Sequence, residues 1–330
     1  MEQIAFIGGN TFIYWSPIVL ALAATAAAAI FAAFYLNKSH NFLAMGLGVL
    51  LSLLLALPLA RLVHWYCYPA NYADFSTAMT DYTTGSYALL GVFAACLVAA
   101  GLLRLVRISS NLPQMLDCMA IGGGVGISLG RLASLFNSSD RGMILPEDVQ
   151  FPFASTVSNA VSGTPENRLA TFMIQSGLVG VIVIALLMFM LVQKLRKKKI
   201  ADGDVFLIFL LAYGACQIIC DSTRYDALFF RSNGFVSVVQ IMGLLGLLVP
   251  VVLFSVRMVK SRGLKAWQFC IWTGILGLLG MVGYMEYYVQ RNAHKAVMTY
   301  SVMGSCLVVV VILGVVIRGL IRAKTPQEIN

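Results

Sequence analysis

Charged side chains are scarce in this sequence. Of its 330 residues, 11% are charged and 59% are hydrophobic, whereas about 25% are charged in an average soluble domain. A soluble fold cannot cover its surface with so few charges, so the mean hydropathy of +0.85 indicates a polytopic membrane protein. The same composition excludes a disordered chain, a coiled coil and a disulfide scaffold.

The residue patterns of hydrolytic, metal and nucleotide sites are also missing. The three histidines form no His-Glu-x-x-His pattern, and no Gly-x-Ser-x-Gly elbow occurs. Cys216 and Cys220 lie one helical turn apart without a nearby histidine, so we interpret them as small core residues. The glycines of 122–126 lack the Gly-Lys-Ser/Thr of a phosphate loop and indicate close helix packing. The sequence therefore implies no metal and no organic cofactor.

Apolar stretches near the length of a membrane-spanning helix, about 20 residues, recur along the chain. We predict nine spans in an all-α membrane bundle. They cover residues 11–36, 42–61, 86–103, 118–136, 169–192, 205–220, 235–256, 266–284 and 296–317. The two longest connections, 65–85 and 137–168, are too short for a soluble domain, so any chemistry takes place at or within the membrane.

The excess of basic residues follows the alternation of these spans. The net charge is +9, and most of the basic residues fall on one side of the predicted membrane. The largest group surrounds the run Lys197–Lys199. Because Lys and Arg accumulate on the cytoplasmic side, we predict an outer N-terminus and an inner C-terminus. Cys67 alone among the cysteines lies in an outer connection, so no outer disulfide pair is expected.

Three arginines lie at the outer ends of different predicted spans: Arg61, Arg131 and Arg224. A single arginine in such a place commonly extends to the lipid headgroups. Three at one depth favour a shared anionic ligand, because the planar guanidinium donates two parallel hydrogen bonds to a phosphate. A phospholipid headgroup is the anion always present at that depth.

The sixth predicted span carries a polar stripe. Gln217, Asp221 and Arg224 are spaced i, i+4, i+7 and therefore share a helical face. The stripe is either a local Asp221–Arg224 ion pair or part of the wall of a headgroup cavity. Asn137 and Gln240 are further candidates for that wall.

These residues resemble a known family. The stretch 130–137 (Gly-Arg-Leu-Ala-Ser-Leu-Phe-Asn), followed by Gly142, resembles the signature of the bacterial prolipoprotein diacylglyceryl transferases (Lgt). Shorter matches occur in the same order. They are Ile13-Tyr14-Trp15, Ala60-Arg61-Leu62, Leu89-Leu90-Gly91-Val92, Tyr213-Gly214-Ala215 with Asp221 and Arg224, and Ser237 with Gln240. The resemblance covers 11–256 and implies an Lgt-like seven-helix domain over 1–258, with two additional helices in 259–330.

The resemblance also implies a reaction. In this family the thiol of a lipobox cysteine attacks the glyceryl carbon of phosphatidylglycerol, and glycerol phosphate leaves. Carried over, Arg131 and Arg224 hold the phosphate, Arg61 supports them, and Asp221 orients Arg224. The remaining expected substrate-binding residues are Asn137, Tyr213, Gln217, Gln240 and Tyr87. The implied partners are phosphatidylglycerol, a prolipoprotein lipobox segment and membrane lipids, without nucleic acid, in a multi-pass protein of the bacterial inner membrane.

Several positions depart from the family pattern. The first-helix tyrosine, the histidine, the first signature asparagine, the signature Gly-Glu pair and an arginine of the sixth helix correspond to Ser16, Ser86, Ser134, Ser138-Ser139 and Gln217. A cysteine thiol, with a pKa of about 8.5, needs a general base less than a hydroxyl does. His64, one turn beyond Arg61, is the candidate to remove the proton.

Two readings follow from these departures. Retention of Arg131, Asn137 and the pattern from Tyr213 to Arg224 favours a transferase. The missing histidine and arginine favour a catalytically degenerate homologue that binds phospholipid or lipoprotein as an accessory factor. A small transporter is disfavoured, because no inverted repeat and no acidic residue at mid-membrane depth stand out.

Overall fold

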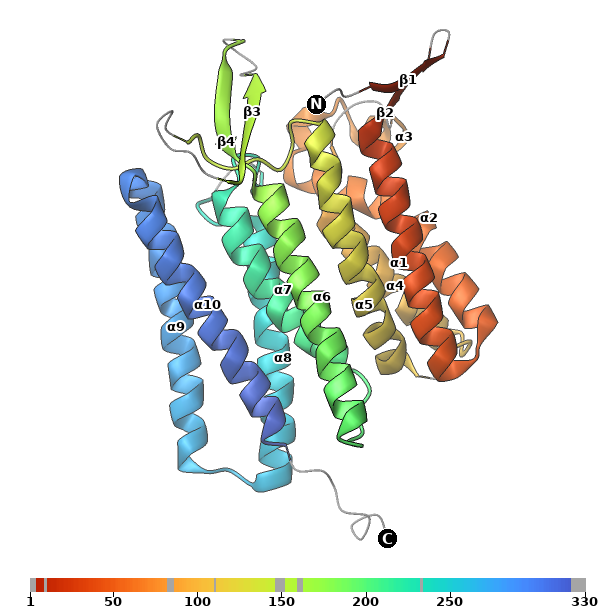
Figure 1. The fold of residues 1–330 in the computed structure, drawn as a ribbon, viewed down its shortest axis with the longest axis vertical. Helices are drawn as coiled ribbons and strands as arrows, with labels where there is room; N and C mark the ends of the chain where they lie inside the picture. Colours follow the sequence, from red (N-terminus) through yellow and green to blue (C-terminus); the bar gives the residue numbers. More distant parts are fainter. Residues whose placement is uncertain are drawn as a thin grey trace. The chain divides into compact units, whose positions relative to one another are not determined.

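The computed structural model describes residues 4–8, 11–81, 86–109, 111–145, 152–158, 163–231 and 234–321. Helices dominate this part of the chain (Figure 1). Among the described residues, eight helices are long and apolar enough to cross a membrane, and the 17-residue apolar helix α4 (Leu89–Leu105) is a shorter ninth. The prediction of an all-α polytopic membrane bundle is confirmed.

The helices divide between two compact units, each described here by itself. The first comprises Met1–Phe206 and Thr223–Val239, and the second comprises Leu207–Ser222 and Gln240–Asn330. The membrane helices of the first unit are α1 (Trp15–Ser39), α2 (Phe42–Cys67), α4, α5 (Leu112–Arg131) and α6 (Thr171–Leu195). Within it, α1 packs along α5, α2 along α4, and α5 along α6 (Figure 1).

Small residues allow the helices of the first unit to approach closely. A Cβ on Gly91 of α4 would lie 2.3 Å from the carbonyl oxygen of Leu59 in α2. A Cβ on Gly122 of α5 would lie 2.6 Å from the carbonyl oxygen of Ala27 in α1. Such backbone contacts are typical of membrane helices, where packing replaces the hydrophobic effect as the driving force.

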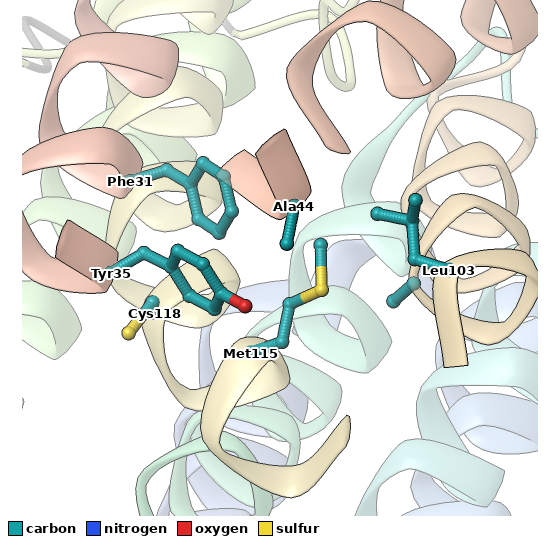
Figure 2. Close-up of a cluster of buried hydrophobic side chains, with 7 residues drawn as sticks. Phe31, Tyr35, Ala44, Leu103, Met115 and Cys118 are labelled. Carbon is teal, nitrogen blue, oxygen red and sulfur yellow. The ribbon is translucent and has the colours of Figure 1, made fainter. Parts of the chain in front are cut away.

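A buried cluster near one end of these helices holds four of them together (Figure 2). Its members are Phe31, Tyr35, Ala44, Ala100, Leu103, Met115 and Cys118, from α1, α2, α4 and α5. The rings of Phe31 and Tyr35 are stacked with their centroids 5.5 Å apart. Cys118 therefore lies in a packed core, as expected for a small apolar residue.

The second unit contains most of α7 (Asp204–Thr223), with α8 (Val238–Arg262), α9 (Ala266–Arg291) and α10 (Ala296–Gly319). The 3-10 turn η3 (Ala293–Lys295) joins α9 to α10, which pack against each other. Gly214 and Gly243 bring α7 against α8, since a Cβ on either would lie within 3.0 Å of the other's carbonyl oxygen. Trp272 of α9 donates a hydrogen bond to Ser255 of α8 over 3.0 Å.

The first predicted span, 11–36, begins too early. Residues Thr11–Tyr14 form strand β2, which pairs antiparallel with β1 (Ile4–Gly8), and α1 starts at Trp15. The run Thr-Phe-Ile-Tyr consists of β-branched and aromatic residues, which prefer a strand over a helix. Apolarity alone did not distinguish this strand from a helix turn.

The fourth predicted span, 118–136, begins too late, whereas its end agrees with the apolar span Leu112–Phe136 of the structure. Helix α5 begins at Leu112, because the side chain of Asn111 accepts a hydrogen bond from the Gln114 N–H and Pro113 occupies the first turn. It ends at Arg131 and continues as the 3-10 helix η2 (Leu132–Phe136). Asp117, the residue before the predicted span, therefore lies inside α5.

Asp117 is buried and bonded to the backbone at the start of α7. Its carboxylate accepts hydrogen bonds from the N–H groups of Gly203 and Phe206 over 2.9 and 2.8 Å. These N–H groups belong to a helix N-terminus, where a negative charge is stabilised. Asp117 therefore anchors the first turn of α7 to α5.

The two long connections contain short elements that the sequence did not predict. After α2, the chain forms the 3-10 turn η1 (Pro69–Asn71) and helix α3 (Phe75–Thr80), capped by Asp74. After η2, strands β3 (Ala154–Ser158) and β4 (Pro165–Leu169) form an antiparallel hairpin (Figure 1). Neither connection holds a separate domain among its described residues.

Candidate functional site

Arg131 and Arg224 converge on one carboxylate. Arg131 is the last residue of α5, and its Nη1 lies 2.6 Å from Oδ1 of Asp140. Arg224, directly after α7, places its Nη2 2.6 Å from the same oxygen. Two guanidinium groups that are far apart in the sequence therefore share one acceptor atom.

Backbone pairing holds the two segments in this arrangement. Gly142 and Arg224 form an antiparallel bridge, and the N–H of Tyr225 donates to the carbonyl of Arg141 over 3.1 Å. A Cβ on Gly142 would lie 2.6 Å from Oγ1 of Thr171 and 3.0 Å from the carbonyl oxygen of Thr223. Glycine is therefore needed where the loop after η2 passes between α6 and the end of α7.

Asp140 is held on every side. Its second oxygen accepts a hydrogen bond from Ser134 over 2.8 Å, and its backbone N–H donates to Asp226 over 2.9 Å. Asp226 also accepts from Nε of Arg224 over 3.0 Å. The φ of Asp140 is 58°, in the left-handed region that aspartate enters more readily than most residues.

The environment keeps Asp140 ionised. Burial alone would raise the pKa of this carboxyl, but the charges of Arg131 and Arg224 and the hydrogen bonds from Ser134 and Arg131 lower it to about 2. The side chains of Arg131, Asp140 and Arg224 are 11%, 13% and 14% exposed. Asp140 is therefore a fixed negative charge at neutral pH and a poor proton acceptor.

A third guanidinium lies against the same loop. Arg141 donates to the carbonyls of Asn137 and Ser134 over 2.8 and 3.3 Å and to the hydroxyl of Ser155, and it lies 5.2 Å from the centre of the Phe172 ring. Burial lowers the pKa of Arg141. We call Arg131, Asp140, Arg141, Arg224 and Asp226 the arginine cluster.

The arginine cluster is suited to an anion. Its three arginines and two aspartates leave a net charge of +1 at neutral pH. Nε of Arg131 and Nε of Arg141 are buried and have no hydrogen-bond partner among the described residues. A buried unpaired N–H is costly, so an oxygen acceptor bound at these two donors would stabilise the cluster.

Asn137 connects this loop to the first helix. Its side-chain oxygen accepts from the backbone N–H and the hydroxyl of Ser139 over 3.0 and 2.6 Å. Its Nδ2 donates to Oγ of Ser16 in α1 over 3.2 Å. Ser16 lies where the family resemblance implies a tyrosine. The hydroxyl that accepts from Asn137 is therefore carried by a shorter side chain.

Arg61 belongs to a different cluster. It is fully buried in α2, and its guanidinium donates to the carbonyls of Ala78, Asp81 and Ser86 over 2.8, 2.5 and 3.4 Å. It also lies 4.6 Å from the centre of the Tyr72 ring. All three guanidinium nitrogens have backbone acceptors, so Arg61 holds the connection after α2 against that helix.

His64 and Tyr87 lie near Arg61. Nδ1 of His64 lies 2.7 Å from the hydroxyl of Tyr72, which in turn lies 3.3 Å from the carbonyl of Ser86. The Tyr87 ring centre is 5.3 Å from the guanidinium of Arg61. The structure thus joins His64, Tyr87 and Arg61, whereas the sequence grouped Arg61 with Arg131 and Arg224. A role for these three in binding or catalysis remains a prediction.

The remaining predicted site residues lie in the second unit. Tyr213 of α7 stacks on Phe209, with ring centroids 5.3 Å apart. Gln217 and Asp221 are buried in the same helix. Gln240 of α8 donates to the carbonyl of Ile218 over 3.5 Å. Their contribution to a ligand site remains a prediction.

Sequence reasoning missed Asp140, Arg141 and Asp226. The family resemblance assigned the signature's acid to Ser139, although an aspartate follows one position later. Asp226, two residues after Arg224, is likewise an acidic residue close in sequence to a predicted phosphate-binding arginine. Nothing in the spacing showed that both acids would meet the predicted phosphate-binding arginines.

A cluster of three arginines and two aspartates at the ends of α5 and α7 thus lies in a multi-pass membrane protein. Residues 3–256 match the prolipoprotein diacylglyceryl transferase family, and the chain belongs to that family. The match ends within α8, so α9 and α10 lie beyond it.

A curated relative agrees with this assignment. The phosphatidylglycerol–prolipoprotein diacylglyceryl transferase of Roseobacter denitrificans (strain ATCC 33942 / OCh 114) is 30% identical over 148 residues. The aligned segment covers 44% of this chain and 48% of the relative. The chain thus matches about half the length of that protein.

Proposed function

We propose that this protein transfers the diacylglyceryl group of phosphatidylglycerol to the lipobox cysteine of a prolipoprotein, in the bacterial cytoplasmic membrane. The observation that carries the proposal is the convergence of Arg131 and Arg224 on Asp140, in a net positive cluster at the ends of two membrane helices. Family membership and the name of the curated relative support it.

The arginine cluster suits the chemistry of such a transfer. The thiolate sulfur forms a bond to the glyceryl carbon, the bond from that carbon to the phosphate oxygen breaks, and glycerol phosphate leaves with the electron pair. Guanidinium groups stabilise the charge that builds on the leaving phosphate. The Nε donors of Arg131 and Arg141, which have no partner among the described residues, are proposed to donate to that phosphate.

Asp140 has a positioning role in this proposal. It fixes the guanidinium groups of Arg131 and Arg224 before the lipid binds. These side chains therefore lose less conformational entropy on binding. With a pKa of about 2 it cannot remove the thiol proton. His64, beside Arg61, is proposed for that step. The few per cent of cysteine that is already thiolate at pH 7 needs no base.

The test is transfer of labelled diacylglyceryl from phosphatidylglycerol to a lipobox peptide by the purified protein. We expect Arg131→Ala to lower the rate at least about 100-fold, the typical loss when one such electrostatic donor is removed. Arg231→Ala, at an exposed arginine in the connection after Arg224, is the matched control and keeps the wild-type rate. Equal rates for wild type and Arg131→Ala would contradict the assignment.

A second function is favoured by two observations. Ser86 replaces the family's histidine, and Asp140 already occupies the arginines that would hold a phosphate. A degenerate homologue that binds phospholipid or lipoprotein without transfer would show saturable binding of phosphatidylglycerol, weakened by Arg131→Ala, and no labelled peptide. Transfer by the wild type would exclude it.

A further inference from the structure

Gln175 is a buried polar residue for which the described part of the chain offers no hydrogen-bond partner. It lies in the second turn of α6 and is 1% exposed. Neither its carboxamide nitrogen nor its oxygen has a hydrogen-bond partner among the described residues. Native structures rarely leave both atoms of a buried amide unpaired, and such a group calls for an explanation.

Contacts of the neighbouring residues locate Gln175 beside the arginine cluster. The N–H of Phe172 donates to the carbonyl of Asp140 over 3.1 Å. The hydroxyl of Thr171 lies 3.0 Å from that of Thr223, the residue before Arg224. Gln175 is four residues after Thr171, so it lies on the same face of α6, one turn further along the helix.

A second contact sets its depth. Ser176 and Ser128 exchange hydrogen bonds, each hydroxyl donating to the other's backbone carbonyl over 2.6 and 2.8 Å. Ser128 lies one turn before Arg131 in α5. Gln175 therefore lies one helical turn from the arginine cluster, on its membrane side.

We propose that Gln175 donates a hydrogen bond from its carboxamide to an ester carbonyl of the diacylglyceryl group. A glycerophospholipid whose phosphate meets the arginine cluster extends its glycerol esters toward the apolar interior, which is the level of Gln175. An ester carbonyl accepts but cannot donate, so the amide nitrogen is its partner. This inference rests on the proposed function and adds the acyl ester as the recognised group.

The test compares two soluble short-chain lipids by calorimetry with the full-length protein. Dioctanoyl phosphatidylglycerol has ester carbonyls, and its dioctyl ether analogue lacks them. We expect the wild type to bind the diester about fivefold more tightly, the worth of one hydrogen bond. In Gln175→Met this preference disappears because diester binding weakens, and Gln193→Met, a half-exposed glutamine of the same helix, keeps it.

Stability provides an independent readout. Methionine fills the same volume without unpaired polar atoms, so Gln175→Met is expected to unfold at or above the wild-type temperature while binding the diester less tightly. If this variant does not fold, Gln175→Leu replaces it. The inference is overturned if the folded variant still prefers the diester, or if the wild type shows no such preference. Either outcome leaves the proposed lipid binding through Arg131 unaffected. Failure of the wild type to bind either lipid overturns both.

Discussion

At the scale of single residues, Asp140 balances the charges of the arginine cluster. It accepts from Arg131 and Arg224 with the same oxygen and from Ser134 with the other. Without it, the guanidinium groups of Arg131 and Arg224 would face each other with Asp226 as the remaining acid of the cluster. The left-handed backbone of Asp140 places the carboxylate between them.

Removal of the Asp140 charge is therefore expected to destabilise the protein. Asp140→Asn breaks a buried charge pair on one side, which typically costs about 3 kcal/mol or more. The measurement is the thermal unfolding temperature in detergent. Asp74→Asn is the control, because Asp74 is an exposed helix cap and asparagine caps a helix as well as aspartate does. The same unfolding temperature for both variants would contradict the role assigned to Asp140.

The same group predicts a pH dependence. Its pKa is about 2 in the folded protein and about 3.9 in an unfolded chain. A lowered folded pKa means that Asp140 stabilises the protein fully above pH 4 and that this contribution is lost as the pH falls from about 4 to 2. Unfolding temperatures of wild type and Asp140→Asn are therefore expected to converge over this range. A constant difference between them would count against a depressed pKa.

At the scale of elements, glycine determines how closely the helices approach. Gly91 and Gly101 lie in the same helix, α4, but in different surroundings. A Cβ on Gly91 would collide with the backbone of α2 at Leu59 and Ala60, whereas a Cβ on Gly101 would meet nothing within 4 Å. Backbone cannot move aside as a flexible side chain can.

This difference makes a paired prediction. Gly91→Ala forces α2 and α4 apart and is expected to lower stability by about 1–3 kcal/mol. Gly101→Ala is expected to be neutral or to raise stability by up to about 1 kcal/mol, because alanine favours a helix. Thermal unfolding of both variants tests the pair. A loss of equal size in both would mean that helix propensity outweighs the backbone contact.

Element boundaries show what local patterns predict well. The apolar runs located the helices, because a membrane span must satisfy its backbone internally over about 20 residues. They placed the starts of α1 and α5 incorrectly, since hydropathy does not register a strand preference or a cap. The apolar runs did not predict β3 and β4, because their pairing joins two separate segments of the chain.

At the scale of the whole molecule, orientation remains a prediction from charge. Basic residues accumulate around Lys197–Lys199, after α6, and the positive-inside rule assigns that loop to the cytoplasm. We expect the cysteine of Lys198→Cys to react with a membrane-impermeant maleimide only after the cells are permeabilised. The cysteine of Arg291→Cys is expected to react in intact cells. Native cysteines are first replaced by serine or alanine. The reverse pattern would invert the topology.

The sequence by itself determined that this is a multi-pass helical membrane protein of the prolipoprotein diacylglyceryl transferase family. Composition, span length and the signature around Arg131 are local properties of the chain. None of them depends on how the helices pack. Arg131 and Arg224 could be recognised in the same way, as basic residues at helix ends that match the family pattern.

Only the tertiary structure decided which groups meet. Arg224 shares Asp140 with Arg131, while Arg61 turns to the backbone carbonyls of Ala78, Asp81 and Ser86. Gln175 has no hydrogen-bond partner among the residues that the structure describes, one turn from the arginine cluster. These relations join residues distant in the chain. They depend on how helices and loops pack, and a one-dimensional pattern contains no record of that packing.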